Sequence, residues 1–165
     1  MRASLITNRC KVRIKDSGSR SMREPGFVLF ILFAALKFFW KNRQIILSLS
    51  LVAEVEQQVV GHIICSKAVV RKEEITLPVL NFGPLSVLPE YQRKGVGKAL
   101  INGMLEKAKA EGHGAILFFG RPEYYPQFGF KEASVYGISD CEGYNFSAFM
   151  AMELIPGYLL PAKGG

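Results

Sequence analysis

The first regular pattern along the chain is a pair of apolar runs separated by a short polar turn. One run leads from Leu47 to Val55, the turn is Glu56 to Gln58, and the second run extends from Val59 to Ile64. Apolar runs arranged in this way are typical of a β-hairpin. The sequence therefore predicts a hairpin here, although its turn lacks the glycine that many short hairpins use.

A third apolar run, Ile75 to Val87, follows the charged connection Arg71 to Glu74. It contains Gly83 and Pro84, and proline has no amide hydrogen to donate to a neighbouring strand. We therefore expect a central strand that is interrupted or bulged at this point.

After Pro89 the spacing of apolar residues changes to that of an α-helix with one apolar and one polar face. The apolar face consists of Val96, Leu100, Ile101, Met104, Leu105 and Ala108, and the polar face of Lys98, Asn102, Glu106 and Lys109. Lys107 and Lys109 suit the last turn of a helix, and Gly112 can close it. The helix is therefore predicted to end just before residue 112.

The rest of the chain predicts two further strands. Ala115 to Phe119 is a short run expected to be buried, and Phe146 to Leu154 is apolar enough to be covered on both faces. Gly137 to Asn145 between them is loop-like. The expected order of elements is several strands, a helix, a strand, a short helix and a final strand. This order predicts an α/β or α+β sheet sandwich. No internal repeat is visible.

The N-terminal part of the chain differs from the rest. Residues 1 to 25 are rich in basic residues, serine and glycine with little periodicity, and they are predicted to form a disordered leader. Residues 26 to 46 form an atypical apolar segment, in which Phe27 to Leu36 is wholly apolar. Lys37 and Lys41 interrupt it before the roughly 20 apolar residues of a membrane span are reached.

This apolar segment does not fit a signal peptide either, because its basic leader is long and no small-residue cleavage site follows. A buried amphipathic or core helix, an interfacial anchor and a non-native N-terminus remain as interpretations. The sequence thus argues against a membrane protein and leaves attachment to a membrane surface as a weaker hypothesis.

Composition narrows the class of protein. A length of 165 residues suits one domain, and 49% hydrophobic residues suffice for a sizeable core. The formal charge of +7 favours an anionic ligand, with nucleic acid, anionic lipid and a phosphorylated cofactor all open. The three cysteines, Cys10, Cys65 and Cys141, are far apart and form no CxxC pair, which suits free thiols in a reducing compartment. The cytoplasm is therefore the expected location.

The segment that carries chemistry is Gln92 to Lys98, where Gly95 and Gly97 open the expected helix. Glycine allows close approach of the backbone, and the first amides of a helix have no internal partners, so an anion can accept hydrogen bonds there. Arg93, Lys94 and Lys98 add positive charge. A tight turn with a solvated basic face is the alternative, since the segment is neither a full GxGxxG nor a Walker loop.

Two motifs together resemble a family. Leu85 to Gly97, with Gln92-Arg93-Lys94-Gly95-Val96-Gly97 at its end, resembles the acetyl-CoA signature of the GNAT superfamily. Tyr124 to Phe130, with a tyrosine four residues before a Gly-Phe pair, resembles its second signature. The resemblance covers roughly Leu49 to Leu154 and is close to a bacterial subgroup of predicted N-acetyltransferases.

The resemblance implies a GNAT-like acyl-CoA N-acyltransferase fold over residues 47 to 165, with a mixed sheet whose bulged strand splays from its neighbour between flanking helices. The co-substrate would be acetyl-CoA, with no metal and no nucleic acid. Backbone groups of Leu85 and Val87 would pair with the pantetheine arm, and the Leu85 amide would hold the oxyanion. The pyrophosphate would lie against Gln92, Arg93, Lys94, Gly95, Val96, Gly97 and Lys98.

Tyr125 falls on the general-acid position of the family, where it would protonate the leaving thiolate. The alternative is a packing tyrosine whose hydroxyl bonds to backbone. Asn81 and Gly83 stand where some relatives carry a histidine base, and nothing places Glu73, Glu74, Glu123 or His62 at the acceptor amine.

The expected activity is transfer of an acetyl group to a primary amine by direct attack in a ternary complex. The acceptor would be a small amine or a peptide amine, and a homodimer is left open. The segment before Leu47 does not align with the family. A non-catalytic acyl-CoA-binding or regulatory module therefore remains the alternative.

Overall fold

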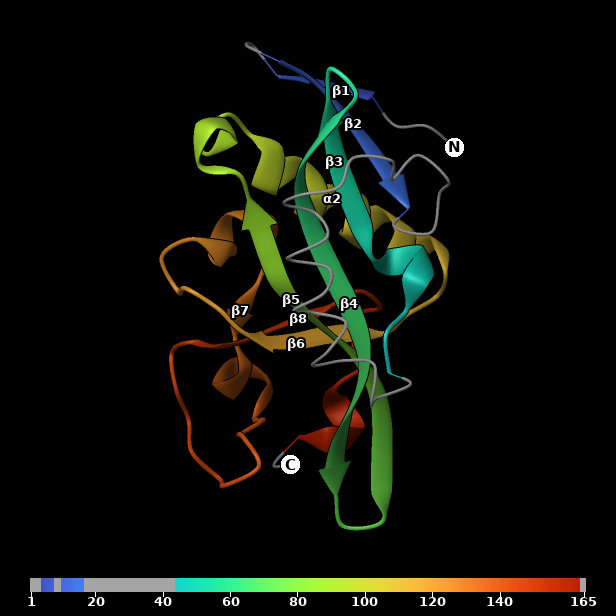
Figure 1. Cartoon of the computed structure of the whole chain (residues 1–165). Helices are drawn as coiled ribbons and strands as arrows, with labels where there is room; N and C mark the ends of the chain where they lie inside the picture. The colour runs from blue at the N-terminus through green and yellow to red at the C-terminus, as the bar shows by residue number, and fades with distance from the viewer. Residues whose placement is uncertain (1–3, 8–9, 17–43, 164–165) are drawn as a thin grey trace. The chain divides into compact units, whose positions relative to one another are not determined.

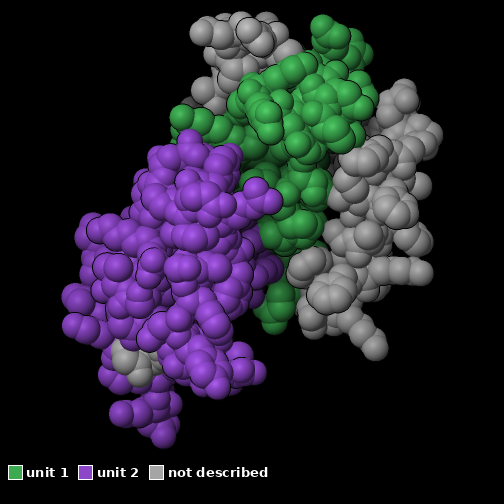
Figure 2. Space-filling model, turned by 90° about the vertical axis from the view of Figure 1, so that its left-hand side faces the viewer, with its two compact units in different colours: residues 1–65, 83–107 green, residues 66–82, 108–165 purple. Residues whose placement is uncertain are grey.

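The computed structural model describes residues 4–7, 10–16 and 44–163. By its contacts the chain forms two compact units, which Figure 2 colours separately. Unit 1 comprises Met1–Cys65 and Gly83–Lys107, and unit 2 comprises Ser66–Phe82 and Ala108–Gly165.

The described strands are hydrogen-bonded in the order β1-β2-β3-β4-β5-β6-β8-β7 (Figure 1). Their bounds are β1 Ser4–Thr7, β2 Cys10–Asp16, β3 Leu51–Val55, β4 Gln58–Lys72, β5 Ile75–Val87, β6 Ala115–Phe119, β7 Lys131–Glu132 and β8 Phe149–Glu153. β5 pairs with β6 in parallel, whereas β1–β2, β2–β3, β3–β4, β6–β8 and β7–β8 are antiparallel. The sheet is therefore mixed, as the family resemblance implies.

The helix α2, Val96–Ala110, confirms the helical pattern, since every residue of its predicted apolar face is buried. The Gly112 amide, at a residue with φ of 78°, donates to the Lys109 carbonyl at 3.1 Å and closes the helix end. The described 3-10 helices are η1 Leu47–Leu49, η2 Pro89–Tyr91, η3 Tyr125–Phe128, η4 Ala133–Tyr136 and η5 Leu160–Ala162. Among the described residues no helix has the length and apolar character needed to cross a bilayer.

The predicted hairpin in unit 1 is β3 and the start of β4. Its turn residues Glu56 and Gln57 have φ angles of 48° and 68°, so they adopt the left-handed conformation that short hairpin turns require, without a glycine. The conformation is uncommon for residues with a side chain, which explains why the sequence signal at this turn is weak.

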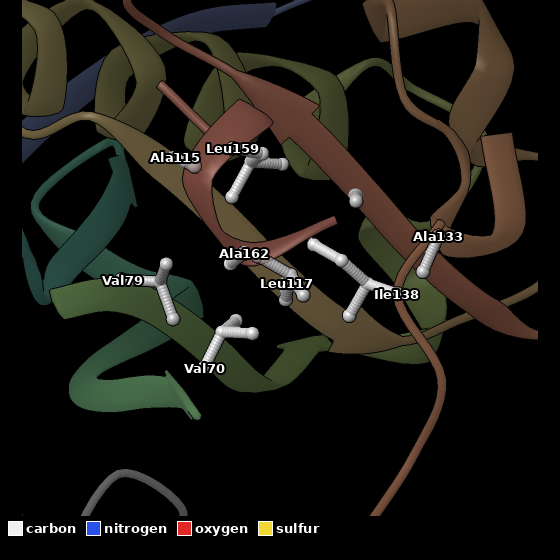
Figure 3. Close-up of a cluster of buried hydrophobic side chains, with 9 residues drawn as sticks. Val70, Val79, Ala115, Leu117, Ala133, Ile138, Leu159 and Ala162 are labelled. Carbon is white, nitrogen blue, oxygen red and sulfur yellow. The ribbon is translucent and has the colours of Figure 1, made fainter. Parts of the chain in front are cut away.

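Unit 2 has its own hydrophobic core. Val70, Val79, Leu117 and Ile138 converge in Figure 3 from β4, β5, β6 and the loop before β8. The last strand begins at Phe149 and not at the predicted Phe146. The reason is local: the Phe149 amide donates to the Phe146 carbonyl at 2.9 Å, which makes these residues a turn.

The structure differs from the predicted disordered leader at residues 4–7 and 10–16. β1 pairs with β2, and β2 pairs with β3 with Arg13 opposite Glu54; Arg13 Nη1 lies 3.9 Å from Glu54 Oε1. In β2 the apolar residues Val12 and Ile14 alternate with basic ones, which is a strand pattern that the interpretation as a leader overlooked. The apolar run Phe27 to Leu36 lies outside the described residues.

Candidate active site

The connection from β5 to α2 is fixed to the strands of unit 1. The Leu88 amide donates to the Val60 carbonyl at 2.8 Å, which holds the end of β5 against β4. The exposed Gln92 side chain donates through Nε2 to the Val87 carbonyl at 3.1 Å. Gln92 therefore ties the connection to β5, a role that the sequence did not predict for it.

The residues Arg93 to Lys98, called the amide turn below, bring the chain into α2. Arg93 and Gly95 have φ angles of 57° and 86°, both in the left-handed region. The Ala99 amide donates to the Gly95 carbonyl at 2.9 Å, which is the first hydrogen bond of the helix. The amides of Val96, Gly97 and Lys98 come before it and have no carbonyl acceptor within the helix. The amide turn therefore offers several donors and the positive end of the helix dipole.

Charge at the amide turn has one sign. Arg93, Lys94 and Lys98 are exposed, and the first turn of α2 contains no acidic residue. Lys94 Nζ lies 5.3 Å from the centre of the Tyr91 ring, within cation-π range. Because these side chains are exposed, their charges act weakly through water and the backbone donors are the stronger feature.

Gly61 on β4 allows the amide turn to lie close to the strands. A Cβ atom at Gly61 would lie 2.9 Å from the Ser86 carbonyl oxygen, 3.2 Å from Val96 Cγ1 and 3.3 Å from Leu100 Cδ1. The first distance is too short for a side chain unless the backbone of β5 moves. Sequence reasoning missed this residue, because only the packing of β4, β5 and α2 shows why a glycine is needed.

β5 is irregular where the sequence predicts it. Gly83 has a φ of 143°, and the Gly83-Pro84 peptide bond is cis. Within the described residues β5 meets β6 at the single pair Leu80 and Ile116, so the two strands stop pairing immediately after it. Leu85 and Val87 are half-buried farther along β5. The pairing of their backbone groups with the pantetheine arm of the cofactor stays a prediction.

Tyr125 begins η3 in unit 2 and is held by aromatic neighbours. Its ring contacts Phe118 edge-on at 4.6 Å between ring centroids and Phe82 at 5.8 Å. Its amide donates to the Arg121 carbonyl at 3.2 Å. A Cβ atom at Gly120 would lie 2.5 Å from the Tyr125 ring, so the glycine leaves the space that the ring occupies.

The environment keeps Tyr125 protonated. Burial raises the pKa of its phenol above the ordinary value of 10.0, and the neighbouring Tyr124 raises it further, while the Arg121 guanidinium lowers it. At neutral pH the hydroxyl therefore carries its proton, which a general acid needs. Tyr125 lies in unit 2 and the amide turn in unit 1, and each is described within its own unit.

The histidine and glutamate side chains that could act as a general base show no common arrangement. His62 is buried in β4, its Nε2 has no hydrogen-bond partner among the described residues, and burial lowers its pKa. His113 Nε2 lies 3.6 Å from Glu111 Oε2. Glu73, Glu74 and Glu123 are exposed. No group of three or more potential metal ligands occurs in the described part of the chain.

Comparison with known families identifies the chain. The family described as Acetyltransferase (GNAT) domain matches residues 47–132, more than half of the sequence. The chain belongs to the GNAT acetyltransferase family. The matched residues include both the amide turn and Tyr125, so the two motifs of the sequence lie inside the family domain.

One curated GNAT relative is the uncharacterized N-acetyltransferase YjhQ of Escherichia coli K12. It is 39% identical over 85 residues, which cover 51% of this chain and 46% of YjhQ. The chain thus matches about half the length of this relative.

Two solved GNAT structures resemble the fold. YhbS from Escherichia coli in complex with CoA has a TM-score of 0.64 and 22% identity over 95% of this chain and 87% of YhbS. A GNAT acetyltransferase from Brucella melitensis in complex with acetyl-CoA has a TM-score of 0.57 and 24% identity over 88% and 89% of the two chains. These similarities confirm the predicted acyl-CoA N-acyltransferase fold.

Proposed function

We propose that this GNAT protein binds acetyl-CoA and transfers its acetyl group to a primary amine by direct attack in a ternary complex. The observation that carries the proposal is the amide turn, where backbone donors and the positive end of α2 meet with no acidic residue in the first helical turn. Such an arrangement suits a pyrophosphate. The family membership and the CoA and acetyl-CoA complexes of similar structures support this ligand.

The chemical step needs an electrophile, a proton donor and a neutral amine. The amine nitrogen attacks the thioester carbonyl, and the Leu85 amide is proposed to stabilise the oxyanion. The intermediate then breaks its carbon–sulfur bond. The departing thiolate takes the proton of the Tyr125 hydroxyl, and the new amide nitrogen loses its extra proton to water. No described acidic or histidine side chain is assigned to that last proton transfer. Tyr125 then regains a proton from water, which completes the cycle.

The proposal for the cofactor is tested by Gly97→Glu. The substitution places a carboxylate at the amide turn, where it repels a pyrophosphate and blocks its approach. Each charge-assisted hydrogen bond that is lost costs about 1.5 to 3 kcal/mol, so calorimetry should detect no acetyl-CoA binding.

Asn102→Glu is the matched control, since it adds the same charge in α2 away from the helix start. Its acetyl-CoA affinity should equal that of the unaltered protein. Unchanged binding in a folded Gly97→Glu variant would contradict the cofactor assignment. Binding without acetyl transfer to any amine would favour the non-catalytic acyl-CoA-binding module.

A further inference from the structure

Unit 2 contains a cavity of about 950 Å³ that lies outside the amide turn. Its lining includes Val70, Val79, Leu117 and Ile138, which belong to the buried hydrophobic core drawn in Figure 3. Phe119 and Phe149 also line this cavity, which we name the Phe119 cavity. Cavities that hold small molecules have volumes of roughly 300 to 1,000 Å³ and mostly apolar linings.

Phe119 is a lining residue whose exposure differs from what the sequence predicts. The sequence predicts a buried strand up to this residue, yet 64% of Phe119 is exposed. Its ring stacks on Phe149 at 4.9 Å between centroids and 24° between planes, which leaves the pair as a flat apolar surface. Covering such a surface with another aromatic ring removes apolar area from water and adds a stacking contact.

Polar groups also line the cavity. Asn81 on β5, just past the last β5–β6 pair, contributes a half-buried amide. Asp140 belongs to a preformed loop, because its Oδ1 accepts from the amides of Glu142 at 3.0 Å and Tyr144 at 2.8 Å. The lining therefore combines a few polar groups with mostly apolar side chains.

The charge of the lining limits the ligand. Glu73 and Asp140 are balanced by Arg71 and Lys72, and Lys72 Nζ donates to the Lys163 carbonyl. A polycation such as a polyamine or an aminoglycoside needs an excess of carboxylates, which this lining lacks. A ligand with an apolar body and no more than one ammonium group is compatible with this balance.

We propose that the Phe119 cavity binds the acceptor, and that the acceptor is a primary amine attached to an aromatic body. This inference rests on the proposed acetyltransferase function. The ring of the acceptor lies against Phe119 and Phe149. Its amine faces the polar side chains of Asn81 and Asp140 and loses its proton to water before it attacks the thioester. Asn81 belongs to β5, the strand whose later residues Leu85 and Val87 are assigned to the cofactor.

The test uses 2-phenylethylamine as the probe and calorimetry on the unaltered protein. Saturable binding is expected, and Phe119→Ala should weaken it about tenfold because the stacking surface is lost. Phe119→Leu keeps an apolar side chain without the ring. Its affinity for 2-phenylethylamine should lie between those of the unaltered protein and Phe119→Ala. Phe146→Ala is the matched control, since Phe146 is 51% exposed and does not line the cavity.

Turnover gives a second readout on the same proteins. With saturating acetyl-CoA, Phe119→Ala should raise the KM for 2-phenylethylamine about tenfold while kcat and the acetyl-CoA affinity stay within twofold. Spermidine should be a poorer acceptor than 2-phenylethylamine. An affinity within twofold of normal in Phe119→Ala, an equal loss in Phe146→Ala, or a preference for spermidine overturns the inference.

These results separate the inference from the proposed function. If acetyl-CoA binds and other amines are acetylated while 2-phenylethylamine does not bind, the inference is wrong and the proposed function stands. If 2-phenylethylamine binds at Phe119 while acetyl-CoA does not bind, the proposed function is wrong and the acceptor role falls with it.

Discussion

The amide turn in unit 1 and the Phe119 cavity in unit 2 are built from different groups. The amide turn offers backbone N–H groups at the start of one helix, and its exposed side chains do little to shape it. The Phe119 cavity is shaped by side chains from β4, β5, β6, β8 and the loop before β8. The proposed anion site therefore follows from local backbone geometry, whereas the proposed acceptor site depends on long-range packing.

A site made of backbone should tolerate most side-chain changes, and a site made of side chains should not. Removing one atom from a catalytic side chain is then expected to have a larger effect than removing a whole basic side chain from the amide turn. The predictions below test this contrast, from the largest expected effect to the smallest.

The largest effect is expected from Tyr125→Phe. The substitution removes the hydroxyl proposed as the proton donor and keeps the ring that packs on Phe118 and Phe82. Stopped-flow measurement of CoA release under saturating substrates should show a maximal rate lower by roughly 10²- to 10⁴-fold. Acetyl-CoA affinity and the melting temperature should change little.

Tyr124→Phe is the control for that measurement, because Tyr124 adjoins Tyr125 and its pKa is also raised by burial. Its chemical rate should stay close to that of the unaltered protein. An unaltered rate in Tyr125→Phe, or the same loss in both variants, excludes Tyr125 as the acid. Because the pKa of Tyr125 lies above 10.0, deprotonation of the acid should lower the rate only above about pH 10.

A second prediction concerns the packing that places the amide turn. Gly61→Ala should lower the free energy of unfolding by about 1 to 3 kcal/mol, since the new methyl group meets the Ser86 carbonyl oxygen at 2.9 Å. Urea unfolding measures the change, and acetyl-CoA affinity should fall with it as the start of α2 is displaced.

Gly103→Ala supplies the matched comparison. A Cβ atom there would lie 3.4 Å from Leu51 Cδ1 and 3.5 Å from Ile14 Cγ2, which is ordinary contact. Alanine inside a helix is favoured over glycine, so this variant should gain up to about 1 kcal/mol. Equal changes in the two variants would show that Gly61 is not a packing requirement.

Local elements could be predicted from the sequence, and long-range features could not. The helix pattern locates α2, the run Ala115 to Phe119 locates β6, and Gly83 with Pro84 locates the irregular part of β5. The GNAT family and its fold follow from the amide turn and the Tyr125 motif, which are both local.

The pairing of strands and the exposure of individual side chains could not be predicted in this way, because they depend on residues that are distant in the sequence. The alternation in β2 is a local signal, but the strand with which it pairs, β3, begins at Leu51, far from Asp16, so the sequence does not predict the pairing. The exposure of Phe119 and the close packing at Gly61 likewise appear only when several strands are assembled. The Phe119 cavity has no sequence signature of its own for the same reason.

The smallest effect is expected from Arg93→Gly. Arg93 has a φ of 57°, which is costly for a residue with a side chain, so glycine should raise the free energy of unfolding by up to about 1 kcal/mol. Acetyl-CoA affinity, measured by calorimetry, should fall less than about tenfold, because the exposed guanidinium acts mainly by screening charge. A complete loss of binding would mean that the arginine side chain, and not the backbone, holds the cofactor.

Cofactor binding at the amide turn is tested most directly by nuclear magnetic resonance on the ¹⁵N-labelled protein during titration with acetyl-CoA. The amide turn is proposed to donate its backbone hydrogens to the pyrophosphate. The amide resonances of Gly95, Val96, Gly97 and Lys98 should therefore shift most, and those near the end of α2 at Lys109 and Ala110 should shift little. Saturable shifts that leave Val96 to Lys98 unmoved would contradict the account.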